Sequence, residues 1–519
     1  MHKIKLILII LLLSSGISFG QTIGDTESIT PEKAYIFIKT RNIQRLLKSF
    51  NYIIYHILGE EERDSIISQR DAFKDITGID YLNEESLKSF GIDTGRSLSY
   101  AIFPQDTGRE VIALFIPVKN GIAFTEKFIE IARRYIQEIE PHSVQYKDIT
   151  VTELKEDMYV AFLNNYFVIT STDDCIKEII DIHRERNRSL ILNPKYKKYI
   201  AEGKNNFDVN IYISPAIANS INITQKDNID DTTENTYDSE LILNAVEYIS
   251  AGFGIEDNTL KMKGALLFAE DNPYVDMILG LLKTGQNQKA LDVNADSYIF
   301  ISLNYKYLNN LCKSNAPFCE TYNSFKKNIK DEGKIDFEKE ILPYFSGMTN
   351  VFLIDSGSSI IGDIAIFLAI DDAQKSEELW KKFKNSVQGR YSKNKKFGEE
   401  RIDGRNSFWY IDQNNIRYFV TFDKRGIYTG NNVNLIKNAL KAKTFEKNNL
   451  QTSNVPLNDK TFFFMNIKKN PFLRNMLLMR SQDSAAIAPF LSKLKEMNIF
   501  CEKLDRHISI GIDIELKGN

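Results

Sequence analysis

The sequence predicts an α+β fold: two tandem copies of one unit, each a mainly antiparallel sheet packed with helices. Similar segments recur about 250 to 260 residues apart, strand-like runs are joined mostly by short polar turns, and helical runs come in blocks. A chain of 519 residues is also too long for a single hydrophobic core. We therefore expect a first repeat domain at residues 21–285 and a second at residues 286–519, after a leader at residues 1–20.

The leader has the organisation of a signal peptide. His2, Lys3 and Lys5 supply a basic start, Ile4 to Leu13 form a nearly unbroken apolar stretch, and small residues stand at the −3 and −1 positions before Gln21. The apolar run is shorter than the roughly 20 residues that span a bilayer. We expect cleavage near Gly20 and a mature chain without a transmembrane span, either periplasmic or secreted.

The opening segments of the two halves match most clearly. Residues 34–50, AYIFIKTRNIQRLLKSF, fall on residues 297–313, SYIFISLNYKYLNNLCK, and both begin with a strand-like Tyr-Ile-Phe-Ile core. Gly91 falls on Gly347, at the point where each helical pattern stops and a strand begins. Because glycine is the usual residue at the end of a helix, both positions predict the same turn.

The later parts of the two halves match in the same order. Thr170 falls on Thr429, and a polar cluster typical of a helix N-cap follows Thr170. Gly252 falls on Gly511, which leaves the first copy with one more strand than the second, at residues 259–268. In the middle of each copy we expect a helix and then alternating strands, at residues 124–139 and 149–170 in the first copy and at residues 374–387 and 407–429 in the second.

Composition and motifs argue against several classes of function. The formal charge of −3 is spread over many acids and bases, so nucleic acid is not an expected partner. The chain lacks a G-x-S-x-G elbow, a Walker A loop and a nucleotide-binding G-x-G-x-x-G, and its few histidines and cysteines lack the spacing of zinc ligands. We therefore predict no cofactor and no catalytic residues, and we favour a non-enzymatic protein over a hydrolase with an unrecognised site.

Asp106 and Asp355 are the residues that most suggest catalysis. Each begins an Asp-Ser/Thr-Gly tripeptide at a nearly equivalent place in its copy, as in two-lobed aspartic proteases. We favour the interpretation that both tripeptides are turns, because they stand between adjacent strand patterns and Asp and Gly are typical turn residues. The copies also contain far more helix than an all-β protease.

Two other segments are candidates for a bound ion or a covalent link. The acidic stretch from Asp227 to Glu240 offers oxygen ligands for calcium but lacks the spacing of an EF-hand, so we favour a solvated loop. Cys312 and Cys319 are close enough in sequence to close a small loop, and an oxidising compartment would permit a disulfide. Whether they are bonded stays open from the sequence.

Aromatic residues are concentrated on the strands of the second copy. Phe408, Trp409 and Tyr410 are consecutive, so both faces of their strand carry a ring. Packing inside the core is the commoner role for such residues. If one face stays uncovered, these three residues form a possible binding surface for a hydrophobic ligand or partner.

The signal peptide, the opening PEKAYIFIKT, the GID and SFG elements before a strand and the closing I-S-x-G-x-x-I strand resemble large extracytoplasmic bacterial proteins that carry a duplicated domain of unknown function. The resemblance implies localisation and architecture and assigns no site residues. We expect an extracytoplasmic binding or structural protein whose partner is an envelope protein, a peptide or a hydrophobic ligand. A hydrophobic-ligand carrier is the remaining alternative.

Overall fold

The computed structural model describes residues 26–104, 110–135, 141–155, 157–201, 207–217, 245–256, 258–270, 272–282, 290–291, 297–312, 319–333, 335–354, 363–391, 396–412, 414–442, 444–445, 460–467 and 494–516. The chain divides into two compact units. Unit 1 comprises residues 1–269 and 485–493, and unit 2 comprises residues 270–484 and 494–519. The leader at residues 1–20 and the boundary expected at residues 285 and 286 both lie outside the described residues.

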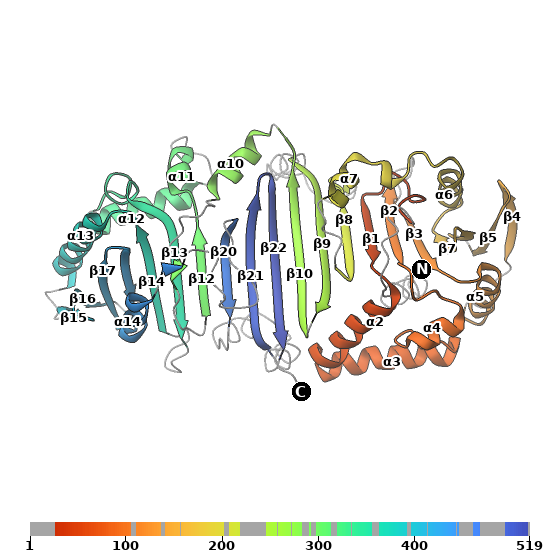
Figure 1. The fold of residues 1–519 in the computed structure, drawn as a ribbon, viewed down its shortest axis with the longest axis horizontal. Helices are drawn as coiled ribbons and strands as arrows, with labels where there is room; N and C mark the ends of the chain where they lie inside the picture. Colours follow the sequence, from red (N-terminus) through yellow and green to blue (C-terminus); the bar gives the residue numbers. More distant parts are fainter. Residues whose placement is uncertain are drawn as a thin grey trace, which may run out of the picture. The chain divides into compact units, whose positions relative to one another are not determined.

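The strands of unit 1 lie side by side in an antiparallel sheet (Figure 1). Its strand order is β4-β5-β6-β7-β3-β2-β1-β8-β9-β10, and every pairing is antiparallel. The strands are β1 (Ile36–Thr40), β2 (Ser99–Pro104), β3 (Glu110–Pro117), β4 (His142–Tyr146), β5 (Ile149–Lys155), β6 (Met158–Leu163), β7 (Tyr166–Thr170), β8 (Val209–Ile213), β9 (Val246–Glu256) and β10 (Thr259–Phe268).

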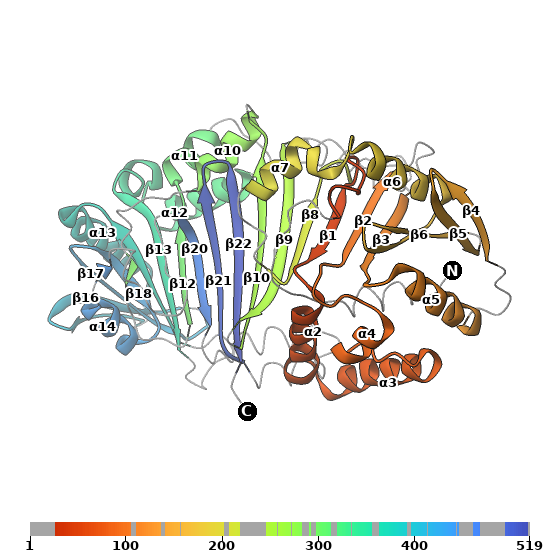
Figure 2. The ribbon, with the colours of Figure 1, turned by 45° about the vertical axis from the view of Figure 1, so that its right-hand side comes forward.

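Helices cover both faces of the unit 1 sheet (Figure 2). They are α2 (Ile43–Tyr52), the π-helix η1 (Ile53–Ile57), α3 (Glu60–Thr77), α4 (Glu84–Phe90), α5 (Gly121–Tyr135), α6 (Asp173–Glu185), the 3-10 helix η2 (Leu190–Leu192) and α7 (Pro194–Ala201). On one face, α6 and α7 bury Ile176 and Tyr196 against Phe37 and Phe115 of the sheet. On the other face, α2, α4 and α5 form a second core with side chains of β3, β6 and β7. Unit 1 therefore has three layers, with the sheet in the middle.

Unit 2 contains the same number of strands in its main sheet. Their order is β15-β16-β17-β18-β14-β13-β12-β20-β21-β22, again with antiparallel pairings throughout. The strands are β12 (Ser297–Ser302), β13 (Phe345–Ile354), β14 (Asp363–Ile370), β15 (Phe397–Ile402), β16 (Arg405–Ile411), β17 (Arg417–Asp423), β18 (Gly426–Gly430), β20 (Thr461–Ile467), β21 (Leu494–Leu504) and β22 (His507–Leu516), and a separate pair is formed by β11 (Ala290–Leu291) and β19 (Thr444–Phe445).

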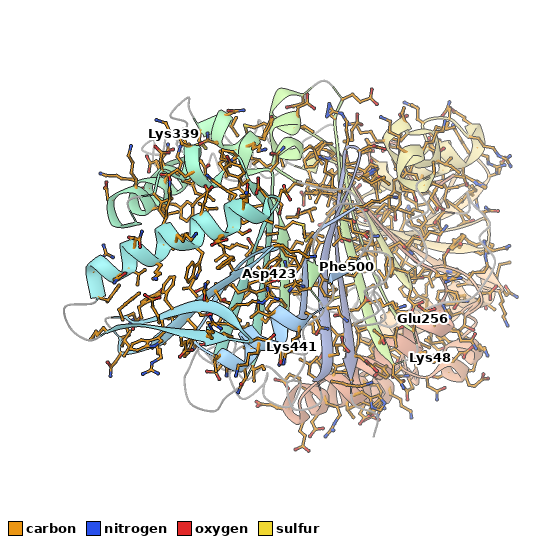
Figure 3. All side chains as sticks on the ribbon, turned by 60° about the vertical axis from the view of Figure 1, so that its left-hand side comes forward. Lys48, Glu256, Lys339, Asp423, Lys441 and Phe500 are labelled. Atoms are coloured by element: carbon orange, nitrogen blue, oxygen red, sulfur yellow. A yellow bond between two sulfur atoms is a disulfide. The ribbon has the colours of Figure 1, made fainter. Side chains whose placement is uncertain are left out.

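Unit 2 also has a core on each face of its sheet. Its helices are α10 (Pro273–Leu281), α11 (Tyr305–Leu311), α12 (Glu320–Gly333), the π-helix η5 (Phe337–Ile341), α13 (Ala373–Tyr391) and α14 (Val433–Lys441). Helix α14 packs on Phe300 and Phe367 of the sheet. Helix α13, the long cyan helix of Figure 3, packs through Trp380 on the opposite face. The predicted α+β class, an antiparallel sheet packed with helices, is confirmed.

The two strand orders correspond strand by strand, which corrects one expectation from the sequence. The first copy does not have an additional strand at residues 259–268, because β10 occupies the place in unit 1 that β22 occupies in unit 2. By the same order, Gly252 lies on β9 and corresponds to a position on β21, whereas Gly511 lies on β22. The sequence match between these two glycines was therefore displaced by one strand.

Candidate functional site

The three consecutive aromatic residues of β16 do not form one surface. Phe408 is fully buried between Trp380 and Phe397, so it belongs to the core under α13. Tyr410 points to the same face and stacks on Tyr391 at a centroid distance of 5.4 Å. Burial raises the pKa of the Tyr410 hydroxyl to about 12. Both residues therefore hold α13 against the sheet.

Trp409 points to the opposite face of β16, because neighbouring residues of a strand alternate. Its indole lies against Gly398 of β15, where an added Cβ would come within 2.5 Å of the ring. The Arg417 guanidinium lies over the ring at 4.5 Å from the centroid. Glycine below and arginine above occupy both sides of the indole, so this ring is not a free platform for a ligand.

Cys312 and Cys319 are joined by a disulfide across a sequence separation of 7 residues. Both are buried, in a cluster with Tyr322, Phe337 and Leu342. The link joins the C-terminal end of α11 to the start of α12. Because the sulfur atoms lie inside an apolar cluster, we assign the disulfide a structural role in unit 2.

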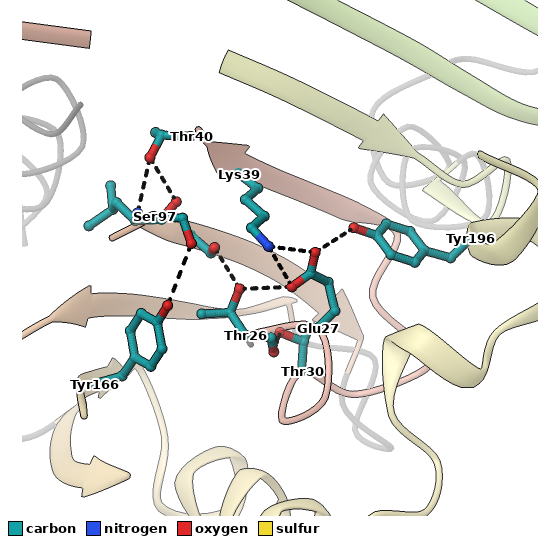
Figure 4. Close-up of polar contacts among 10 residues, drawn as sticks. Thr26, Glu27, Thr30, Lys39, Thr40, Ser97, Tyr166 and Tyr196 are labelled. Atoms are coloured by element: carbon teal, nitrogen blue, oxygen red, sulfur yellow. Dashed lines mark hydrogen bonds and ion pairs between the residues drawn. The ribbon is translucent and has the colours of Figure 1, made fainter. Parts of the chain in front are cut away.

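A part-buried ion pair in unit 1 forms a polar cluster beside its core (Figure 4). The Glu27 carboxylate accepts hydrogen bonds from Lys39 Nζ at 2.7 and 2.8 Å and from the Tyr196 hydroxyl at 3.3 Å. Burial, and then the nearby Glu27 charge, raises the pKa of Tyr196 well above its usual value. Thr26 Oγ1 also lies 2.8 Å from Ser99 Oγ. These contacts attach the turn before β1 to β1, β2 and α7, which is a structural role.

A second charged cluster stabilises the end of a helix in unit 2. The Asp423 carboxylate, labelled in Figure 3, lies 2.8 Å from Arg425 Nη2 and 3.3 Å from Arg405 Nη1. Arg425 also donates to the carbonyl oxygens of Leu440 at 2.7 Å and Ala442 at 2.5 Å, at the C-terminal end of α14. Cations are favourable at this end of a helix dipole. The arginine is therefore committed to capping α14.

The described part of the chain contains no group of three or more His, Cys, Asp or Glu side chains that could hold a metal ion. Asp106, Asp355 and the acidic stretch from Asp227 to Glu240 lie outside the described residues. None of the described helices is long and apolar enough to cross a membrane.

The feature of unit 2 with the most binding potential is an apolar sheet face that we call the isoleucine face. Two cross-strand rows define it, and the pairing register places their side chains on one side of β12, β20, β21 and β22. The rows consist of Ile301, Phe463, Cys501 and Ile510, and of Ile299, Met465, Ile499 and Ile512.

The isoleucine face keeps part of its apolar area accessible. Every one of the eight side chains is partly exposed, and Ile510 reaches 47%. Met497 extends the same face along β21. The unbranched methionines give this surface some adaptability of shape, whereas its isoleucines are stiff. A surface of this kind suits an apolar ligand or partner and lacks the convergent ionisable groups of a catalytic site.

One end of the isoleucine face carries a lysine that donates hydrogen bonds to backbone carbonyl groups. Lys503, two residues after Cys501, directs its ammonium group to the carbonyl oxygens of Leu279 and Leu282 near the end of α10. Burial lowers the pKa of Lys503. Burial also raises the pKa of the Cys501 thiol to about 11, which disfavours the reactive thiolate.

Sequence reasoning missed the isoleucine face, although a signal for it exists. In β22, isoleucine stands at every second position from Ile508 to Ile514, and the residues between are Ser, Gly and Asp. This alternation indicates a strand with one apolar face and one polar face. The alternation does not show whether the apolar face is buried or exposed, so the sequence alone did not distinguish this strand from an ordinary core strand.

Comparisons with known proteins assign a domain without assigning a function. Residues 94–299 match the model of a family described as a protein of unknown function, DUF3352. No curated protein matches the chain. Two solved structures described as crystal forms I and III of TP0453 align at 11% and 12% identity, TM-scores of 0.25 and 0.26, and coverage of 52% of this chain and 90% and 88% of those chains. Likeness at this level supports no conclusion about the fold or the function of this chain.

Proposed function

We propose that this protein is an extracytoplasmic, non-enzymatic binding protein built from a duplicated α+β unit, and that it binds an apolar ligand or partner on the isoleucine face of unit 2. The observation that carries the proposal is the pair of partly exposed apolar rows across β12, β20, β21 and β22. The match to a domain of unknown function at residues 94–299 is consistent with a non-enzymatic role.

Two observations support the duplication. Both units have the same order of antiparallel strands, and the corresponding strands β1 and β12 both carry Ile-Phe-Ile directly after a tyrosine. Gly91 and Gly347, which the sequence match pairs, both adopt a left-handed backbone with φ of 105° and 88°. The two glycines nevertheless occupy different places, because Gly91 caps the C-terminal end of α4 and Gly347 lies inside β13, so their match in the sequence does not mark one shared turn.

The extracytoplasmic location rests on the leader. A basic start, a short apolar run and small residues at the −3 and −1 positions before Gln21 are typical of secretory signal peptides. The Cys312–Cys319 disulfide suits an oxidising compartment. N-terminal sequencing of the exported protein should give Gln21 as its first residue, and an intact N-terminus in the cytoplasmic fraction would contradict this location.

Titration with the apolar fluorophore bis-ANS tests the binding surface. We expect the wild-type chain to bind the dye, and Ile510→Glu and Ile512→Glu to weaken binding at least about tenfold, because each places a carboxylate in the apolar rows. Leu192→Glu is the matched control, because Leu192 is a similarly exposed apolar residue, 43% accessible, in unit 1. Equal losses in the control and in the two isoleucine variants would overturn the assignment.

A further inference from the structure

The two units end their sheets in different kinds of edge strand. In unit 1, β5 is the single described pairing partner of β4, and in unit 2, β16 is the single described partner of β15. The edge β15 carries three consecutive exposed charged residues, Glu399, Glu400 and Arg401. Charges on an edge strand discourage pairing with another chain. This edge is therefore protected.

Strand β4 has no such protection. Its sequence is His-Ser-Val-Gln-Tyr, with no Lys, Arg, Asp, Glu or Pro, and residues 142–145 are all exposed. Val144 is 43% accessible at the centre of the strand. A short neutral edge with an exposed β-branched residue is a template for adding a strand from another chain.

The geometry of the β4–β5 hairpin shows which backbone groups are directed outward. Lys147 and Asp148 form the two-residue turn, with φ of 47° and 63°, as in a type I′ turn. The closing pair, Tyr146 and Ile149, is then hydrogen-bonded, and alternation directs the backbone groups of Val144 toward β5. The N–H and C=O groups of Ser143 and Gln145 consequently point away from the sheet.

The side chains of β4 are self-complementary under a twofold rotation about Val144. In antiparallel pairing with a second copy, Val144 faces Val144, and Ser143 faces Gln145. The valine pair continues an apolar row that begins at the buried Val151 of β5. On the other face, Ser143 and Gln145 already contact Thr152 and Thr150 of β5 at 3.0 and 2.7 Å, so this face is polar but uncharged.

The side chains of β15 are not self-complementary under a twofold rotation. Antiparallel self-pairing centred on Glu399 or on Glu400 places a glutamate directly opposite its own copy, and centring on Arg401 places an arginine opposite its own copy. Like charges directly opposite each other destabilise a strand pair. Of these two edges, β4 therefore fits a second copy of this chain.

We propose that the protein forms a homodimer in which β4 of one copy pairs antiparallel with β4 of its partner about Val144. The inference is independent of the isoleucine face. Ser143 and Gln145 supply the new backbone hydrogen bonds, and Val144 supplies the central side-chain contact. Because a single pair of five-residue strands makes a small interface, the dimer is a reversible one.

Sedimentation velocity of the mature chain tests the dimer through charge substitutions at Val144. We expect the wild-type protein to dimerise in a concentration-dependent manner up to about 100 μM. Val144→Lys and Val144→Glu should each weaken dimerisation at least about tenfold, because like charges meet at the twofold axis. An equimolar mixture of the two variants should restore dimers, because lysine then faces glutamate.

Two further variants separate the edge from general destabilisation. Gln145→Pro removes an outward N–H without removing a β4–β5 backbone hydrogen bond, and the side-chain bond to Thr150 that it also loses is solvent-exposed, so it should abolish dimers and leave the melting temperature nearly unchanged. Val144→Thr keeps a neutral β-branched residue and should still dimerise. A wild-type chain that stays monomeric throughout, or a lysine–glutamate mixture that stays monomeric, would overturn the proposal.

Discussion

Units 1 and 2 build the same order of strands but cover it differently. In unit 1, Leu46 and Phe50 of α2 pack on Val209 of β8 and Phe253 of β9, which covers this end of the sheet. In unit 2, the corresponding helix α11 packs into the disulfide cluster and against α10, and the corresponding strands carry the isoleucine face. The matching apolar rows of unit 1, which include Ile36, Ile213 and Ile249, are partly exposed as well, so α2 covers one end of the corresponding face and not the whole of it.

The largest effect is expected from matching core positions of the two units. Phe37 of β1 and Phe300 of β12 are both fully buried at the centre of their sheets, so Phe37→Ala and Phe300→Ala should each lower the free energy of unfolding by about 3 to 5 kcal/mol. Both tryptophans, Trp380 and Trp409, lie in unit 2. Tryptophan fluorescence during denaturant unfolding should therefore respond to the Phe300 variant alone.

Circular dichroism serves as the control for that experiment, because it reports on both units. We expect the Phe37 variant to move the circular dichroism transition while leaving the tryptophan transition in place. A tryptophan midpoint that shifts equally in both variants would show that the two units unfold as one cooperative body.

The disulfide should produce the next largest effect, confined to unit 2. Replacing both Cys312 and Cys319 by serine removes a constraint on a short loop, which should cost about 2 to 3 kcal/mol of unfolding free energy. Tryptophan fluorescence measures this loss. Cys175→Ser in unit 1, where the thiol is buried and free, is the matched control and should leave the tryptophan midpoint unchanged.

Two helix caps at corresponding positions should give smaller and unequal effects. Thr172 caps α6 and Asn432 caps α14 through their side-chain oxygens, so alanine at either position should cost about 1 kcal/mol. Asn432 also donates to Asp363 at 2.6 Å, so its replacement should cost more. Thermal unfolding of Thr172→Ala and Asn432→Ala measures the difference, and a larger loss for Thr172→Ala would refute the assignment of this extra bond.

The smallest expected effect is a pH dependence that belongs to unit 1. Burial, and then the neighbouring Arg184 and Arg186, lowers the pKa of His183. The folded state therefore disfavours the protonated imidazole, and stability falls as pH decreases through the unfolded-state pKa near 6.5. Because His183 is half-buried, the loss should stay below about 1 kcal/mol.

Chemical unfolding at pH 7.5 and pH 5.5 measures this dependence as a difference between the wild-type chain and His183→Gln. The glutamine variant should lose less stability on acidification than the wild type. Identical pH dependence in the two proteins would exclude His183 as its source.

Local signals in the sequence predicted much of the fold. The helices expected at residues 124–139 and 374–387 correspond to α5 (Gly121–Tyr135) and α13 (Ala373–Tyr391), because their apolar periodicity is strong. The polar cluster after Thr170 supplies the N-cap Thr172. These features depend on interactions between residues that are close in sequence, so they can be read without the tertiary structure.

Strand register could not be predicted, because it depends on partners that are distant in sequence. The match of Thr170 with Thr429 is displaced by one residue: Thr170 lies two residues before the N-cap Thr172, and Gly430 lies two residues before the N-cap Asn432. A shift of one residue moves a side chain to the other face of a sheet. The match of Gly252 with Gly511 is also wrong, because it pairs a residue of β9 with a residue of β22, whereas the strand that corresponds to β9 is β21.

Each of those two glycines leaves room for an aromatic ring, from Phe207 just before β8 in unit 1 and from Phe500 of β21 in unit 2. A Cβ at Gly252 would come within 2.5 Å of the Phe207 ring, and a Cβ at Gly511 would come within 2.0 Å of the Phe500 ring. Phe500, labelled in Figure 3, lies on β21 directly opposite Gly511. The glycine that makes room for a ring therefore lies on β9, the first strand of the β9–β10 hairpin, in unit 1. In unit 2 it lies on β22, the second strand of the β21–β22 hairpin.

The candidate site was less predictable than the fold. The sequence shows that Phe408, Trp409 and Tyr410 are aromatic, but it does not show that α13 and Arg417 occupy their rings. The isoleucine face likewise depends on which strands a helix leaves uncovered. Accessibility is a property of the assembled unit, and a single strand does not encode it.

Photolabelling with a hydrophobic diazirine tests the central claim most directly. After irradiation of the folded mature chain and peptide mapping by mass spectrometry, we predict that labels concentrate on the strands β20, β21 and β22, at Met465, Ile499, Ile510 and Ile512. The end of the unit 1 sheet on which α2 packs, around the buried Val209, should carry fewer labels. Labels that are as frequent at Val209 as at Ile510, or that gather away from β20 to β22, would contradict the assignment of the isoleucine face as the binding surface.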